Sequence, residues 1–226
     1  MLQLTPILLA VLYALAMYRL SGWRTLKTLD AQSTPLTDPT ILRLAAQMAT
    51  ALDLPQIKVN VYEIAPVNGL AASDGRIFLT RGFLEKYRSG EVTAPEIASV
   101  IAHELGHVAL GHSKRRMIDV TGQNAMFVVL TALLSRFIPF IGIWLARLIT
   151  TTLAATLSRR DEHEADAYAS ALLVKAGIGT APQKSLFRKL DALTGAAGQQ
   201  PPAWLQSHPL SAERIAEIEK REARWA

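Results

Sequence analysis

The chain has 226 residues, of which 50% are hydrophobic and 19% are charged, with 13 Gly, 11 Pro and no Cys. This composition excludes a disordered polyelectrolyte, a collagen-like fibre and a disulfide-stapled scaffold. Without Cys, a metal site must be built from His, Asp and Glu. The net charge of +5 does not indicate a nucleic-acid partner, because the Lys and Arg residues form no single stripe interleaved with aromatic residues.

The N-terminus is the first apolar stretch. The mean hydropathy of +0.20 is high for a soluble domain, and residues 1–18 carry no charged side chain. A helix of that length spans about 27 Å, close to the hydrocarbon thickness of a bilayer. We therefore expect residues 1–20 to form a transmembrane anchor. The alternative is a signal peptide cleaved near Ala14-Leu15-Ala16, which would release a periplasmic protein.

Basic residues follow this apolar run and none precedes it. Arg19, Arg24 and Lys27 place the C-terminal side in the cytoplasm by the positive-inside rule, so we expect an inner-membrane protein with its catalytic domain on the cytoplasmic side. Residues 21–37 are expected to be a linker, since the stretch from Thr28 is polar and contains Pro35.

The remaining domain, residues 38–226, is expected to mix helices with short strands. Asp38 and Pro39 predict a helix start. Alternating apolar residues predict a strand at residues 57–61, and a second strand is expected at residues 76–80 after the turn Ser73-Asp74-Gly75. The residues Thr93, Pro95 and Glu96 predict the start of a further helix that runs to about Gly111.

An apolar helical insertion is expected at residues 120–157. A single continuous crossing would place Arg147 near mid-bilayer at a cost of about 2.5 to 3.5 kcal/mol. A hairpin that turns between Pro139 and Gly142 avoids this, and it would be a membrane hairpin. The alternative is a buried or interface-lying pair of helices in a soluble domain.

One motif carries the chemistry. The sequence His103-Glu104-Leu105-Gly106-His107 is an H-E-x-x-H. Residues four apart lie about 40° apart around a helix axis, so both imidazoles can bind one zinc ion while the glutamate reaches its water. A third protein ligand is then needed. His112 points away unless the helix has ended at Gly111, whereas residues 161–166 offer several carboxylates, with Glu162 and Asp166 on one helical face.

Three ordered motifs then resemble a known family. They are H-E-x-x-H at residues 103–107, S-R-x-x-E-x-x-A-D at residues 158–166, and H-P-x-x-x-x-R from His208 to Arg214. Together they are similar to those of the HtpX-like membrane metalloproteases, relatives of the CAAX prenyl proteases. The resemblance implies an α+β, mainly α-helical gluzincin domain with a small antiparallel sheet, and one Zn²⁺ per chain.

The resemblance also implies a role for each motif residue. The expected metal ligands are His103, His107 and Glu162. Glu104 is the expected general base, and Asp166 is expected to support a ligand from behind. His208 and Arg214 would be catalytic residues that steady the oxyanion. The substrate would add as a strand along Val67–Ala71, contacting the residues Asn68, Gly69, Leu70 and Ala71.

The expected function is a membrane-anchored zinc metalloendopeptidase that hydrolyses misfolded or membrane-associated proteins. Its expected partners are a polypeptide substrate and membrane lipid. The alternative is a non-catalytic zinc-containing membrane chaperone or binding module. An intact Glu104 favours the enzyme, because a purely structural zinc site needs no general base.

Overall fold

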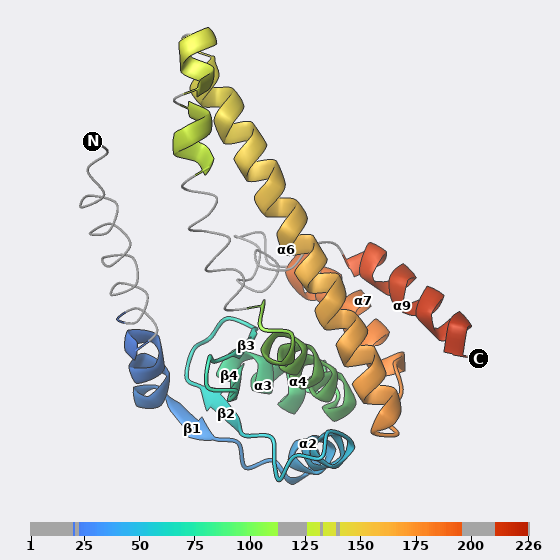
Figure 1. Cartoon of the computed structure of the whole chain (residues 1–226). Helices are drawn as coiled ribbons and strands as arrows, with labels where there is room; N and C mark the ends of the chain where they lie inside the picture. The colour runs from blue at the N-terminus through green and yellow to red at the C-terminus, as the bar shows by residue number, and fades with distance from the viewer. Residues whose placement is uncertain are drawn as a thin grey trace.

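The computed structural model describes residues 20, 23–112, 126–131, 133–138, 141–195 and 211–225. Most of the predicted anchor at residues 1–20, part of the insertion and His208 lie outside these ranges. In the described residues a small sheet packs with several helices, and one long helix extends away from them (Figure 1). The domain is therefore mainly helical with a small sheet.

The sheet has four strands in the order β1-β2-β4-β3. The strands are β1 Ser33–Pro35, β2 Val59–Tyr62, β3 Gly69–Ala71 and β4 Ile77–Thr80. The expectation of an antiparallel sheet is wrong, because β2 and β4 are parallel, while the other two pairs are antiparallel. The physical reason is the tight turn at Gly75, whose φ is 86°. This turn reverses the chain after β3, so β4 runs antiparallel to β3. Because β4 lies between β3 and β2, it pairs with β2 in the same direction.

Six helices have defined bounds in the described residues. They are α2 Pro39–Ala51, α3 Arg81–Arg88, α4 Ala94–Ala109, α6 Gly142–Lys175, α7 Ala181–Gly195 and α9 Ser211–Trp225. The predicted helix starts are found. Asp38 accepts hydrogen bonds from two backbone N–H groups of α2, and Thr93 forms a capping box with Glu96 at α4. A core of buried aliphatic side chains joins α2, α4, α6 and the sheet.

The segment expected to be a linker contains regular structure. Residues 23–31 are helical and are followed by β1. Leu29 on this helix is buried against Phe78 and Ala72, on the face of the sheet that α4 does not cover. The polar stretch from Thr28 concealed this helix, since only a few apolar residues, among them Leu26 and Leu29, anchor it.

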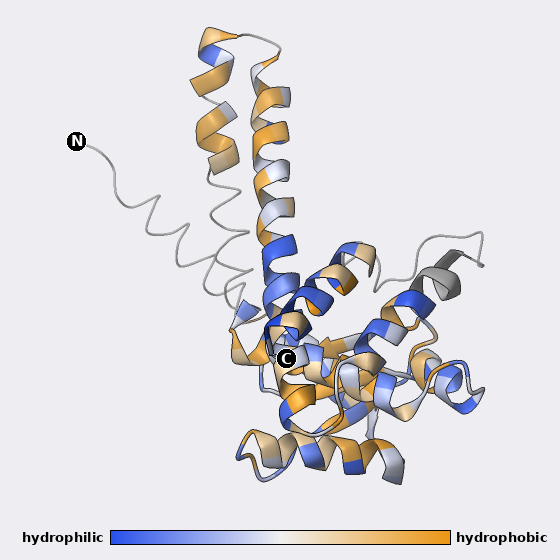
Figure 2. Cartoon of the chain, turned by 90° about the vertical axis from the view of Figure 1, so that its right-hand side faces the viewer, coloured by the Kyte–Doolittle hydropathy of each residue, from blue (hydrophilic) through white to orange (hydrophobic). Residues whose placement is uncertain are grey.

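The insertion forms two helical arms that lie side by side, residues 126–131 with 133–137 and the first half of α6 (Figures 1 and 2). They touch at Gly142, where a Cβ would lie 2.5 Å from the backbone nitrogen of Ser135. The apolar side chains here are not buried, since Phe137 is 77% exposed and Trp144 is 70% exposed. This excludes a buried pair for the described residues. In the part of the chain that is described, no helix meets the length and hydropathy needed to cross a membrane.

The domain end of α6 packs directly on α4. A Cβ at Gly106 would lie 3.0 Å from the carbonyl oxygen of Ala165 and 3.1 Å from its Cα. The two helices therefore meet at backbone distance, and a Cβ here on α4 would require the α6 backbone to give by a few tenths of an ångström. This contact brings the H-E-x-x-H of α4 against the acidic segment of α6.

Candidate metal centre

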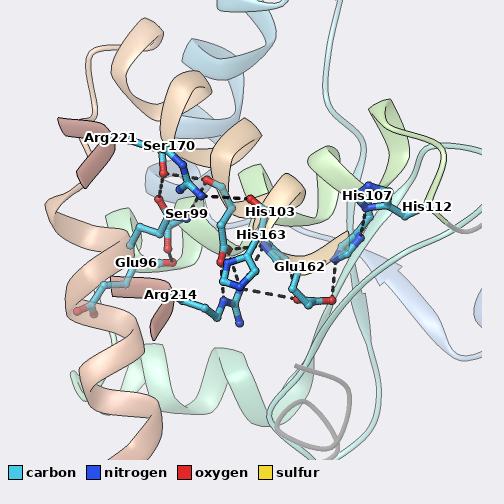
Figure 3. Close-up of polar contacts among 12 residues, drawn as sticks. Glu96, Ser99, His103, His107, His112, Glu162, His163, Ser170, Arg214 and Arg221 are labelled. Atoms are coloured by element: carbon cyan, nitrogen blue, oxygen red, sulfur yellow. Dashed lines mark hydrogen bonds and ion pairs between the residues drawn. The ribbon is translucent and has the colours of Figure 1, made fainter. Parts of the chain in front are cut away.

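The two helices bring three metal-ligating groups to one point (Figure 3). The Nε2 atoms of His103 and His107 lie 3.1 Å apart. Carboxylate oxygens of Glu162 lie 3.3 Å from the first Nε2 atom and 3.5 Å from the second. All three side chains are buried. The three residues expected to bind metal are thus within reach of a single ion.

These residues fit zinc. Tetrahedral ligand atoms at the usual zinc distances of 2.0–2.1 Å are about 3.3 Å from one another, close to the three separations found. Two imidazoles and one carboxylate are also a donor set that catalytic zinc sites use, with one position left for water. His103, His107 and Glu162 would hold the ion.

Glu104 lies beside this triad and is buried. Its Oε1 atom has no hydrogen-bond partner among the described residues, while the backbone N–H of Ala71 donates to the carboxylate. Burial raises the pKa of Glu104 to about 7, against the lowering effect of His103. A carboxylate with an open oxygen and a pKa near neutrality suits a general base.

Asp166 supports the first ligand from behind. Its Oδ1 atom is 3.0 Å from Nδ1 of His103, and Arg214 donates to both of its oxygens at 2.6 Å. Burial alone would raise the pKa of Asp166, but the Arg214 guanidinium and His103 hold it well below its usual range. The ionised carboxylate can therefore accept the Nδ1 proton of His103, so that Nε2 would carry the lone pair that a metal ion needs.

Arg214 was expected to steady the oxyanion, and its described contacts are with Asp166, His103 and Glu162. The side chain is 2% exposed, and its Nη2 atom lies 3.4 Å from Nδ1 of His103 and 3.8 Å from Oε2 of Glu162. The guanidinium also stacks 4.2 Å from the ring centre of Phe187. We therefore assign Arg214 to positioning Asp166. His208 lies outside the described residues.

His112 joins the site in a way that the sequence left open. The helix ends at Ala109, and Gly111 has a φ of 67°. Because the chain turns there, His112 does not continue the helix, and its Nδ1 atom lies 2.8 Å from Nδ1 of His107. Gly111 was the signal for this return, since glycine after the last helical residue marks a helix end.

The predicted substrate strand lies at the edge of the sheet. Asn68 and Ala72 pair with β4 through Thr80 and Arg76, so the alternate backbone groups of β3 point away from β4. A Cβ at Gly69 would lie 2.6 Å from Cγ1 of Val100 and 3.6 Å from Cγ of Glu104. The strand therefore runs directly over α4 beside Glu104. Leu70, one residue on, packs on the opposite face with Phe78.

This arrangement defines a class of protein. A helix with H-E-x-x-H, a glutamate on a second helix within reach of the same ion and an edge strand beside Glu104 are the arrangement expected of a metallopeptidase. The sequence pattern of peptidase family M48 matches residues 35–222. The chain belongs to peptidase family M48, so the resemblance drawn from the three motifs is confirmed at the level of the family.

Several relatives bear metalloprotease names. Metalloprotease LoiP of Escherichia coli is 34% identical over 165 residues, which are 73% of this chain and 62% of LoiP. Metalloprotease YcaL of the same organism is 29% identical over 187 residues, which are 80% of this chain and 68% of YcaL. The beta-barrel assembly-enhancing protease of Escherichia coli is 30% identical over 168 residues, 69% of this chain but 32% of that protein.

The assignment of Arg214 predicts a loss of stability when it is replaced. Arg214→Met leaves the buried Asp166 carboxylate without its cation, which should lower the free energy of unfolding by about 3–5 kcal/mol. Denaturant unfolding of the full-length chain in detergent measures this. Arg188→Met, an exposed arginine on α7, is the matched control and should change little. If Arg214→Met lowered turnover but left the free energy of unfolding unchanged, the result would favour a role of Arg214 at the oxyanion.

Proposed function

We propose that this chain is a zinc-dependent, membrane-anchored metalloendopeptidase that cleaves misfolded or membrane-associated proteins. The observation that carries the proposal is the buried Glu104, with an oxygen that no described residue occupies, between the His103, His107 and Glu162 triad and the edge strand β3. A structural zinc site has no use for such a base. The alternative of a non-catalytic zinc module is therefore disfavoured.

When bound by the triad, zinc would supply Lewis acidity, which lowers the pKa of water from 15.7 towards about 7 and polarises a carbonyl. The residues of the chain do the rest. Glu104 takes the proton of the attacking water at its open oxygen and later delivers it to the leaving amine nitrogen. Asp166 and Arg214 keep the His103 ring fixed while this occurs.

The substrate class follows from the geometry of β3. The outward backbone groups of Gly69 and the outward carbonyl of Ala71 can pair with an extended peptide, while the Ala71 N–H donates to Glu104. Only a segment without its own hydrogen-bonding partners can add to a sheet edge. We therefore propose unfolded polypeptide as the substrate, recognised mainly through its backbone.

Replacing the base tests this function directly. In Glu104→Gln, zinc should remain at one ion per chain, because the metal ligands are untouched, while cleavage falls by about 10²- to 10⁴-fold. Metal analysis and casein cleavage on detergent-purified full-length protein measure both. Reduced, unfolded ribonuclease A should be cut by the wild type, and the native form should not.

Glu85→Gln, an exposed glutamate on α3, is the matched control and should retain both zinc and cleavage. Full proteolysis by Glu104→Gln with bound zinc would refute the assigned base. Zinc in the wild type without any cleavage would favour the binding module instead.

We also propose that the helical hairpin inserts into lipid. Its two arms stand away from the domain and are coloured largely as hydrophobic (Figure 2), and they carry these exposed apolar side chains: Val128, Val129, Leu133, Phe137, Ile138, Ile141, Ile143, Trp144, Leu148, Ile149 and Leu153. An exposed patch of this extent marks a surface that is covered in use. Arg136 and Arg147, both exposed, can snorkel to headgroups. The predicted anchor at residues 1–20 would also attach the protein to the membrane.

Because the chain has no Cys, single cysteines can report this insertion. A fluorophore on Phe137→Cys should be quenched by spin-labelled lipid in proteoliposomes, and one on Leu54→Cys should not. Quenching of Phe137→Cys by aqueous iodide alone would contradict insertion.

The side of the membrane is tested in right-side-out spheroplasts, where an impermeant maleimide should not label Leu54→Cys if the domain faces the cytoplasm. Its labelling would instead indicate the periplasmic alternative.

A further inference from the structure

Behind the second metal ligand lies a row of polar side chains that the mechanism above does not use. Nδ1 of His107 faces Nδ1 of His112 at 2.8 Å (Figure 3). Nε2 of His112 in turn lies 3.2 Å from Glu164 and 3.9 Å from Asp161. The His112 side chain is 1% exposed. Where His103 rests on a carboxylate, His107 thus rests on a second imidazole.

The hydrogen bonds of this row follow from the ligand geometry. Nε2 of His107 faces the other ligands, so it must carry the lone pair, and the ring proton must be on Nδ1. Nδ1 of His112, at 2.8 Å, can receive that proton as a hydrogen-bond acceptor. His112 then carries its own proton on Nε2 and donates it to Glu164. Each nitrogen in the row has one role, and no two N–H groups oppose each other.

The backbone places His112 for this purpose. A helix continued to residue 112 would carry its side chain about half a turn from His103. The chain instead leaves the helix at Gly111, whose φ of 67° is one that glycine adopts without strain. On the far side, Arg160 donates to the other oxygen of Glu164 at 2.8 Å, which holds the end of the row.

We propose that His112 is a positioning residue for the metal site. It fixes the tautomer and ring orientation of His107 as a neutral hydrogen-bond acceptor, and Glu164 fixes His112. This inference rests on the proposed zinc site, but not on peptidase activity. Outer hydrogen-bond partners of metal-bound imidazoles contribute directly to metal affinity, so the role is measurable without any substrate.

Three replacements of His112 separate the effect of losing a hydrogen-bond acceptor from the effect of losing packing. His112→Asn places a carbonyl oxygen where Nδ1 stood, so zinc affinity should stay close to that of the wild type. His112→Leu fills the volume without an acceptor and should weaken zinc binding by about 10- to 100-fold. His112→Gln can still donate to Glu164 but offers no acceptor to His107, so it should resemble His112→Leu.

The measurement is zinc affinity by chelator competition on the full-length chain, with the visible spectrum of the Co²⁺-loaded protein as a reporter of ligand geometry. His163→Asn, a histidine on α6 that faces Glu213, is the matched control and should behave as the wild type. If circular dichroism shows that His112→Leu does not fold, the zinc affinities of His112→Asn and His112→Gln are compared instead.

Two results would overturn the proposal. One is an unchanged zinc affinity and Co²⁺ spectrum in the variants that lack an acceptor. The other is a second zinc ion per chain that His112→Asn abolishes, since His112, Asp161 and Glu164 would then be ligands themselves. Tight zinc binding without casein cleavage would count against the proposed function alone and would leave the affinity comparison intact.

Discussion

The structure depends on the backbone contact between α4 and α6. Gly106 lets the two helices approach until the place of its missing Cβ is 3.0 Å from the carbonyl oxygen of Ala165. Ligands from one helix and a ligand from the other can share an ion only at such a short separation. A Cβ in the middle of H-E-x-x-H would require the α6 backbone at Ala165 to give by a few tenths of an ångström, which would move Glu162 relative to His103 and His107. The motif therefore encodes helix packing as well as coordination.

Charge pairing fixes how the rest of the domain closes around this contact. A buried carboxylate is tolerated only with a partner, and Asp166 finds its partner on the last helix, α9. Arg214 reaches it from there and stacks on Phe187 of α7 at the same time. One side chain thus ties α6, α7 and α9 behind His103. The α4 helix, by contrast, is tied to α7 at its start through Glu96 and Lys189.

The sequence predicted the parts of this account that depend on local patterns. Helix caps at Asp38 and Thr93 and the spacing of His103 and His107 follow from rules that act within a few residues. The parallel pairing of β2 with β4 could not be predicted, because it depends on where a hairpin returns in space. The contacts of Arg214 with Asp166 and His103 could not be predicted either, because they depend on how α9 packs against α6. Residues 23–31 were taken as linker because their apolar face is short.

X-ray absorption at the zinc edge of the full-length protein identifies the metal ligands. We expect nitrogen and oxygen neighbours at about 2.0–2.1 Å, with scattering from two imidazoles, and a loss of bound zinc in Glu162→Gln. A first shell with three imidazoles, or a spectrum that Glu162→Gln leaves unchanged, would contradict this expectation. The first of these results would make His112 a ligand, and the second would remove α6 from the site.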